Sequence, residues 1–151
     1  MLLTTKASYA QEHNIHPVSY IFDPSTNAKQ NISDALVKAA KEHKHIFMLI
    51  GGDWSFWCRL FYKMLYTTDI KKCMDEKYVL VAVNFSPENR NSEVLTTYNC
   101  PKNQGYPIII VLDDKGREIH IQDTDMYKES GKWYDGNAIL RDMKQWAAAE
   151  K

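Results

Sequence analysis

The sequence predicts one α/β domain in which a central mixed sheet is flanked by helices. Residues 46–50, 78–83 and 107–112 are continuous apolar runs, a pattern typical of strands buried on both faces. A helical segment separates the first two runs, which favours a parallel crossover. The turn signal at 113–116 leads into 118–121, which predicts an antiparallel hairpin. With 151 residues the chain is long enough to bury one hydrophobic core.

The amino-terminal part of the chain is polar, irregular and interrupted by prolines. We therefore expect an extended arm over residues 1–30 and a folded domain over residues 31–151. A first helix is predicted over residues 33–43, because apolar residues recur there at helical spacing and Ser33 is a suitable N-cap.

The first apolar run ends at Gly51 and Gly52, and an amphipathic helix is predicted soon afterwards, over residues 58–65. This order places the aromatic-rich segment 54–58 at a strand-to-helix junction, where we expect the functional centre. Apolar spacing predicts further helices over residues 70–74, 92–98 and 137–148.

The charge balance excludes some classes of partner. Lysine plus arginine and aspartate plus glutamate number 19 each, so no net field attracts nucleic acid or an anionic membrane. Apolar runs such as residues 78–83 are much shorter than the ~20 residues that span a bilayer. We expect no nucleic-acid partner and no membrane insertion, and the oligomeric state stays open.

Cysteine and histidine spacing gives no sign of a metal site. The three cysteines, Cys58, Cys73 and Cys100, form neither a CxxC pair nor a zinc-ligand set. The five histidines include two close pairs, but no cysteine or carboxylate cluster joins them. The sequence therefore predicts neither a metal nor a cofactor.

Two segments carry a resemblance to a known family. Residues 51–58, Gly-Gly-Asp-Trp-Ser-Phe-Trp-Cys, resemble the Gly-Ala-x-Trp-Cys-Pro-Trp-Cys motif of the exported, disulfide isomerase-related branch of the thioredoxin-like superfamily. Gly105-Tyr106-Pro107 is similar to that family's cis-proline loop. The resemblance extends roughly over residues 34–146. It implies a thioredoxin-like fold, a cis bond before Pro107, and exchange with protein or peptide thiols and disulfides.

The chain departs from the family motif at its attacking cysteine. Ser55 stands at that position, and only the second cysteine, Cys58, is kept. A serine hydroxyl does not ionise near neutral pH, so Ser55 and Cys58 cannot form a dithiol couple. Two substitutes stay open at this stage: Cys58 acting alone, or Cys100 as an auxiliary thiol. Cys73 is interpreted as a small buried hydrophobe.

The resemblance also implies a substrate-binding surface. Tyr106, before the proline, would expose backbone groups that pair with a bound peptide. Trp54 and Trp57 would offer an apolar platform, with Phe56 and Pro107 beside it. For Trp57, packing in the core is an equally good interpretation.

Two functions are carried forward. The first is a thiol-disulfide oxidoreductase or isomerase lineage in which Ser55 marks either a natural monothiol variant or a Cys-to-Ser trap. The second is a non-catalytic peptide-binding module on the same scaffold. A peroxide-reducing enzyme is disfavoured, because Cys58 lacks the motif of an acidified peroxidatic cysteine.

Location is predicted from the family branch and from the amino end. Ser8-Tyr9-Ala10 resembles the small-x-small pattern before a signal-peptidase cut, whereas Met1-Leu2-Leu3 is too short for a complete signal core. We expect a periplasmic or otherwise exported protein, with a cytoplasmic one as the alternative.

Overall fold

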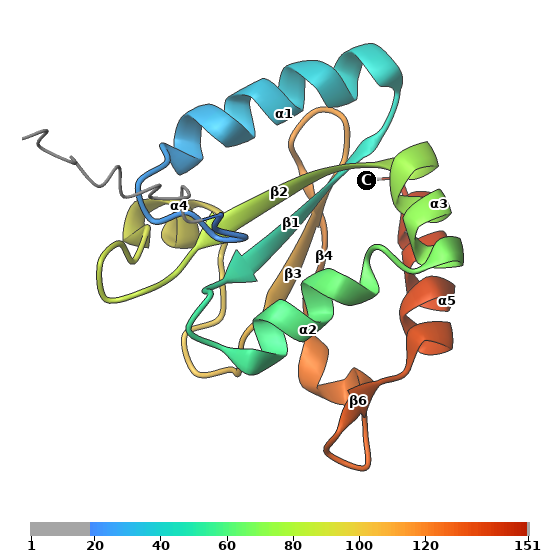
Figure 1. The fold of residues 1–151 in the computed structure, drawn as a ribbon. Helices are drawn as coiled ribbons and strands as arrows, with labels where there is room; N and C mark the ends of the chain where they lie inside the picture. Colours follow the sequence, from blue (N-terminus) through green and yellow to red (C-terminus); the bar gives the residue numbers. More distant parts are fainter. Residues whose placement is uncertain (1–18, 151) are drawn as a thin grey trace, which may run out of the picture.

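The central sheet has four strands in the order β2-β1-β3-β4 (Figure 1). A computed structural model describes residues 19–150 of the chain. Strand β1 pairs in parallel with β2 and antiparallel with β3, and β3 pairs antiparallel with β4. The mixed sheet predicted from the apolar runs is therefore confirmed. The strands are β1 (His45–Gly51), β2 (Tyr78–Asn84), β3 (Ile108–Leu112) and β4 (Glu118–Asp123).

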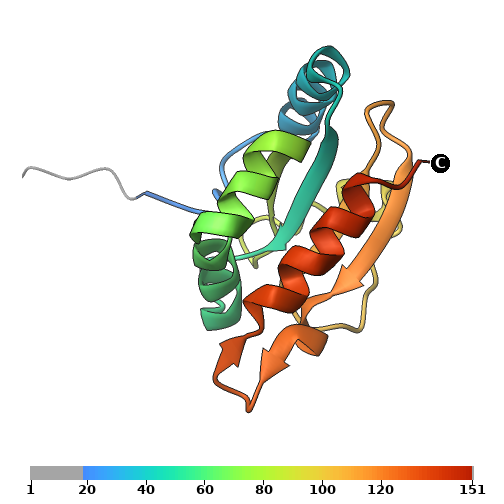
Figure 2. The same cartoon turned by 90° about the vertical axis from the view of Figure 1, so that its right-hand side faces the viewer.

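Helices cover both faces of this sheet (Figures 1 and 2). One hydrophobic cluster joins the sheet to α1 and α4, and the other joins it to α2, α3 and α5. Among the described residues, no helix combines the length and the apolar character that crossing a bilayer requires. The helices are α1 (Ala28–Glu42), α2 (Phe56–Met64), α3 (Thr68–Lys77), α4 (Ser92–Thr97) and α5 (Gly136–Ala147).

Strand β1 contributes to both clusters. Phe47 and Leu49 pack on the side of α2, α3 and α5, whereas Ile46, Met48 and Ile50 pack on the side of α1 and α4. All five side chains are fully buried. Successive strand residues point to opposite faces of a sheet, so a strand with helices on both sides needs a continuous apolar run.

Several helices begin earlier than the sequence predicted, among them α1 and α2. The expected N-cap of α1, Ser33, is wrong, because α1 begins at Ala28 and the side chain of Asn27 caps it by accepting the N–H of Gln30. Asparagine is as good an N-cap as serine, and both positions suit the apolar spacing. Helix α2 begins at Phe56, before the predicted residue 58.

The segment between β4 and α5 contains three short elements that the sequence did not reveal. They are the 3₁₀ helix η1 (Thr124–Tyr127) and the strands β5 (Lys128–Glu129) and β6 (Trp133–Tyr134), which form a small hairpin. The Tyr127 hydroxyl donates a 2.7 Å hydrogen bond to Asp142 of α5. This bond ties η1 to the last helix.

Part of the predicted amino-terminal arm lies outside the described residues, together with the Ser8-Tyr9-Ala10 pattern. Within the described part, Phe22 is buried in the cluster that contains α2. The Asp53 carboxylate accepts the main-chain N–H groups of Ile21 and Phe22 at 3.1 and 3.2 Å. Asp53 therefore fixes this segment against the start of α2, a role that no local sequence pattern indicated.

We expect Leu49→Ala to lower the free energy of unfolding by about 2–5 kcal/mol, because it leaves a cavity in the fully buried centre of the sheet. Urea denaturation measures the change. Val37→Ala is the matched control: Val37 is 71% exposed on α1, so its loss should change stability by less than about 0.5 kcal/mol. Equal effects of the two substitutions would contradict this description of the core.

Candidate functional site

The strand-to-helix junction depends on close packing at the end of β1. A Cβ atom on Gly51 would lie 2.5 Å from the Sγ of Cys58, and one on Gly52 would lie 2.1 Å from the Nε1 of Trp54. Both distances are shorter than two non-bonded atoms tolerate. The two glycines therefore allow the first turn of α2 and the Trp54 ring to lie against the backbone.

Ser55 is the N-cap residue of α2. Its backbone is extended, its side chain is buried, and its hydroxyl accepts the N–H of Cys58 at 3.3 Å. The hydroxyl thus satisfies one of the N–H groups that a helix start leaves without a partner. The position at which the family motif has its attacking cysteine is here occupied by a residue well suited to cap the helix.

The Cys58 thiol lies inside the first turn of α2 and is fully buried. Burial raises its pKa above the ordinary value, and the hydrogen bonds from Ser55 and Gly52 only partly oppose that effect. Near neutral pH the group is therefore a protonated, enclosed thiol, and a thiol in this state is a poor nucleophile.

The Tyr106-Pro107 peptide bond is cis, as the sequence predicted. The hydroxyl of Thr124 in η1 donates a 2.7 Å hydrogen bond to the Pro107 carbonyl oxygen and so supports the loop from below the surface. The Tyr106 ring stacks on Phe85, with ring centroids 4.6 Å apart and planes 13° apart.

Trp54 connects the helix start to the cis-proline loop. Its ring meets Tyr106 edge-on, with centroids 6.1 Å apart, and its indole N–H donates a 2.7 Å hydrogen bond to the Phe85 carbonyl oxygen. Burial, and then the nearby thiols of Cys100 and Cys58, raise the pKa of Tyr106. The structure thus brings Trp54, Ser55, Cys58 and Tyr106 together.

The three predicted aromatic residues of segment 54–58 differ in exposure. Trp54 and Phe56 are each 56% exposed, so both rings are accessible to a partner. Trp57 is half-buried: its ring meets Tyr134 edge-on at 5.4 Å, and the Lys128 ammonium lies 4.1 Å from its centroid. These contacts favour packing as the main role of Trp57, the alternative that the sequence left open.

Cys100 and Cys58 pack in different hydrophobic clusters. Cys100 belongs to the cluster that contains α1 and α4, and Cys58 belongs to the cluster on the other face of the sheet. Neither forms a disulfide. Burial raises the pKa of Cys100 to about 11. The auxiliary role considered for Cys100 stays a prediction.

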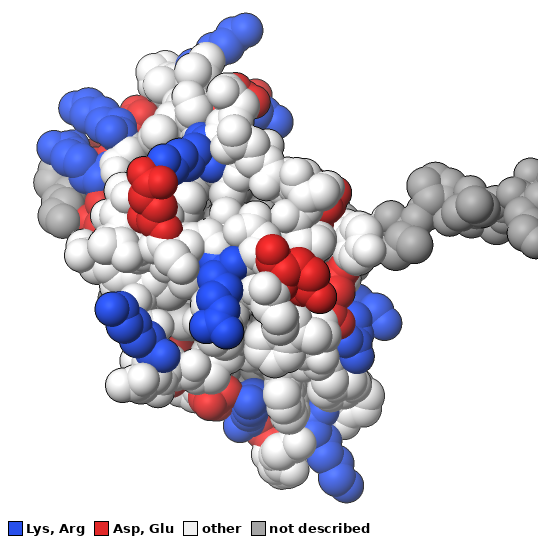
Figure 3. Space-filling model, turned by 90° about the vertical axis from the view of Figure 1, so that its left-hand side faces the viewer, with Lys and Arg blue, Asp and Glu red and all other residues white. Residues whose placement is uncertain are grey.

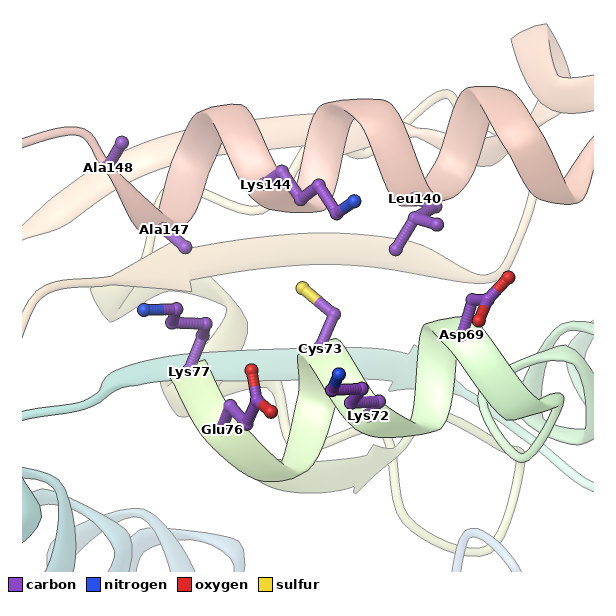
Figure 4. Close-up of a pocket in the computed structure, with 9 residues that line it drawn as sticks. All are labelled: Asp69, Lys72, Cys73, Glu76, Lys77, Leu140, Lys144, Ala147 and Ala148. Carbon is purple, nitrogen blue, oxygen red and sulfur yellow. The ribbon is translucent and has the colours of Figure 1, made fainter.

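Cys73 lies away from this site, in a cavity of about 660 Å³ between α3 and α5 (Figure 4). Its Sγ points into the gap between the helices, towards α5, the helix that carries Lys144 (Figure 4). Burial raises the pKa of this thiol, in keeping with its interpretation as a small buried residue. Among residues 19–150, no three His, Cys, Asp or Glu side chains are grouped so that they could hold a metal ion.

A helix start that faces a cis-proline, at the end of a mixed four-stranded sheet with helices on both sides, defines the thioredoxin-fold class of proteins. The sequence matches the thioredoxin-like family model over residues 27–114. The chain belongs to this family.

Solved structures share the fold at low sequence identity. A disulphide isomerase from Xylella fastidiosa Temecula1 superposes with a TM-score of 0.74 at 18% identity, over 85% of this chain and 97% of that one. A DsbH oxidoreductase gives 0.56 at 18% identity, over 97% and 96%. The exposed lipoprotein thioredoxin from Streptococcus pneumoniae gives 0.50 at 15% identity, over 73% and 89%. Comparison with curated protein sequences gives no match.

Sequence reasoning missed Phe85, Thr124 and Tyr134 as neighbours of the site. Phe85 directly follows β2, and its carbonyl and ring hold Trp54 and Tyr106. The Tyr134 hydroxyl donates to the Trp57 carbonyl oxygen at 3.5 Å. One sequence signal could have found Phe85: it directly follows an apolar run, at the carboxyl end of a parallel strand. Thr124 and Tyr134 come from short elements without a periodic pattern.

The contact between Gly51 and Cys58 can be tested by a double-mutant cycle. Gly51→Ala should lower the free energy of unfolding by about 1–3 kcal/mol, because the new methyl group collides with Sγ. In a Cys58→Ala background the same change should cost at least about 1 kcal/mol less. Urea denaturation of the four proteins measures the coupling. Cys73→Ala, which removes a distant thiol, should give no rescue, and equal rescue by both backgrounds would contradict the contact.

The thiols should react slowly in the folded protein. Since only the thiolate attacks and burial raises the pKa of Cys58, its labelling rate should still be rising with pH at pH 9. Timed alkylation with peptide mass spectrometry assigns the rate to this residue. In denaturant all three cysteines should react. A labelling rate for Cys58 that is already constant at pH 7 would show an acidified thiol.

Proposed function

We propose that this thioredoxin-like protein binds extended protein segments at the surface formed by the start of α2 and the cis-proline loop, without completing a dithiol cycle. It represents a thiol-disulfide oxidoreductase or isomerase lineage that lacks its attacking thiol. The observation that carries the proposal is the pairing of a capping hydroxyl at Ser55 with a fully buried thiol at Cys58.

Disulfide exchange needs a thiolate that attacks one sulfur of the partner's disulfide. That step forms a mixed disulfide and releases the other partner sulfur as a thiolate; a second thiolate then displaces the bound partner. Ser55 provides no thiolate for the first step. Cys58 is enclosed, and burial raises its pKa, so it is poorly suited to replace Ser55.

The binding surface has the features that peptide capture requires. Trp54 and Phe56 expose large rings with few rotatable bonds, which gain contact area at a low entropic cost. The cis-proline loop supports strand-like pairing of a partner backbone at Tyr106. The partners we propose are protein or peptide segments, including those that carry thiols or disulfides.

The second candidate function is catalysis of thiol-disulfide exchange, and one feature of the site favours it. Ser55 lies at the amino end of α2, beside the N–H of Cys58. A sulfur at this place would accept that N–H and would lie at the positive end of the helix dipole. Each of these two interactions stabilises a thiolate and so lowers the pKa of a thiol. If Ser55 marks a Cys-to-Ser trap, the surrounding site is already arranged for exchange.

An exported location forms part of the same proposal. The support comes from the resemblance of residues 51–58 to an exported branch and from the fold shared with the exposed lipoprotein thioredoxin. Fractionation of cells that express the full chain would test it, with recovery in the cytoplasm as the contrary result.

We expect Trp54→Ala to weaken binding of reduced, carboxymethylated insulin B chain about tenfold, because it removes an exposed anchor ring. Tyr66→Ala, at an exposed tyrosine on the segment after α2, is the matched control and should leave the dissociation constant unchanged. Fluorescence anisotropy of the labelled chain gives both values. Failure of the unaltered protein to bind would overturn the binding proposal.

Ser55→Cys separates the two candidates. The parent chain should not reduce insulin with dithiothreitol above the background rate, whereas Ser55→Cys should gain turnover if the lineage is catalytic. Ser55→Cys with Cys58→Ala, which cannot resolve a mixed disulfide, is the control and should stall after one exchange. A Ser55→Cys protein that still binds the B chain but shows no turnover would exclude the catalytic candidate.

A further inference from the structure

A cavity of about 550 Å³ lies on the other side of Tyr106 from Cys58, between α4 and the cis-proline loop. Its apolar lining includes Phe85, Leu95, Cys100 and Tyr106. Its volume lies within the range of sites that accept a small ligand or a large side chain.

Two cationic side chains line this cavity, and no carboxylate does. Arg90 and Lys102 are both exposed, and neither forms an ion pair with a residue of the described part of the chain. Figure 3 shows the face that carries α4, on which basic and acidic residues are otherwise interspersed. An occupant that combines an apolar body with a negative group is therefore complementary to the cavity.

Tyr106 links this cavity to the surface of Trp54. One side of the Tyr106 ring stacks on Phe85, which also lines the cavity, and its edge meets Trp54. Tyr106 is part of the cavity lining, so a partner backbone that pairs at Tyr106 would run beside the cavity. Alternate side chains of an extended segment point to opposite sides, so one of them is directed inward.

The Cys100 thiol, which lines the cavity, does not make it a redox site. Burial raises the pKa of Cys100 to about 11, so almost no thiolate is present near neutral pH. Cys100 contributes apolar surface instead.

We propose that this cavity is a specificity pocket that receives one bulky apolar side chain of a bound protein segment, with an adjacent Asp or Glu held by Arg90 and Lys102. The inference rests on the proposed function, because it needs a segment bound at Trp54 and Tyr106. It adds a sequence preference that the exposed aromatic rings alone do not supply.

Three cysteine-free, amino-terminally acetylated peptides test the pocket. They share flanking residues and carry Leu-Glu, Ser-Glu or Leu-Lys at the centre. We expect the unaltered protein to bind the Leu-Glu peptide at least about fivefold more tightly than the other two, by isothermal titration calorimetry. Equal affinity for all three would overturn the proposal.

Charge reversal at the cavity should change this preference. Arg90→Glu with Lys102→Glu should weaken Leu-Glu binding by about tenfold and improve Leu-Lys binding. Lys41→Glu with Lys115→Glu, at exposed positions outside the lining, is the matched control and should keep the preference for Leu-Glu. Equal losses in both double variants would point to net charge and overturn the pocket.

A filled cavity gives a test that does not alter charge. Thr96 is exposed on α4 at the cavity wall, so Thr96→Trp should fold normally, as thermal unfolding will check, and should remove the advantage of Leu over Ser. An unchanged advantage would overturn the pocket.

If Trp54→Ala abolishes binding of all three peptides while the parent shows no preference among them, the proposed function stands and the pocket alone fails. If the parent binds none of the three peptides and no B chain, both fail.

Discussion

Strand β1 is the constraint on which the site depends, because it pairs with a neighbour on each side and lies between two helix layers. In its register, Gly51 lies opposite Asn84 of β2, and Ile50 lies opposite Ile108 of β3. The segments that leave these strands therefore meet at one end of the sheet. They are the start of α2, Phe85 and the cis-proline loop, and burial of β1 on both faces keeps this end in a fixed arrangement.

Sequence reasoning predicted the features that local sequence patterns determine. The apolar runs predicted the mixed sheet, and the resemblance of residues 105–107 to the family's proline loop implied the cis bond. The anchoring of Phe22 by Asp53 joins residues far apart in the chain, so no local pattern reveals it. The same holds for Thr124, whose hydroxyl supports Pro107 from an element that only tertiary contacts stabilise.

In the proposed function, Ser55 keeps the fold without the redox chemistry. A helix start favours an anionic sulfur and a capping hydroxyl for the same reason, namely its N–H groups without partners. A serine at this position therefore keeps the local structure while it removes the nucleophile. The hydrogen bond from the N–H of Cys58 is consistent with this exchange of roles, since it gives the hydroxyl a structural purpose.

Cys58 and Cys100 belong to the hydrophobic clusters on opposite faces of the sheet, and Tyr106 packs against both clusters. Cys58 and Cys100 are both buried, each in its own cluster, and neither forms a disulfide. Recognition needs no such bond. The rings of Trp54, Tyr106 and Phe85 form a continuous series from the helix start to the cavity beside α4, so a bound segment can contact both without any change in the buried thiols.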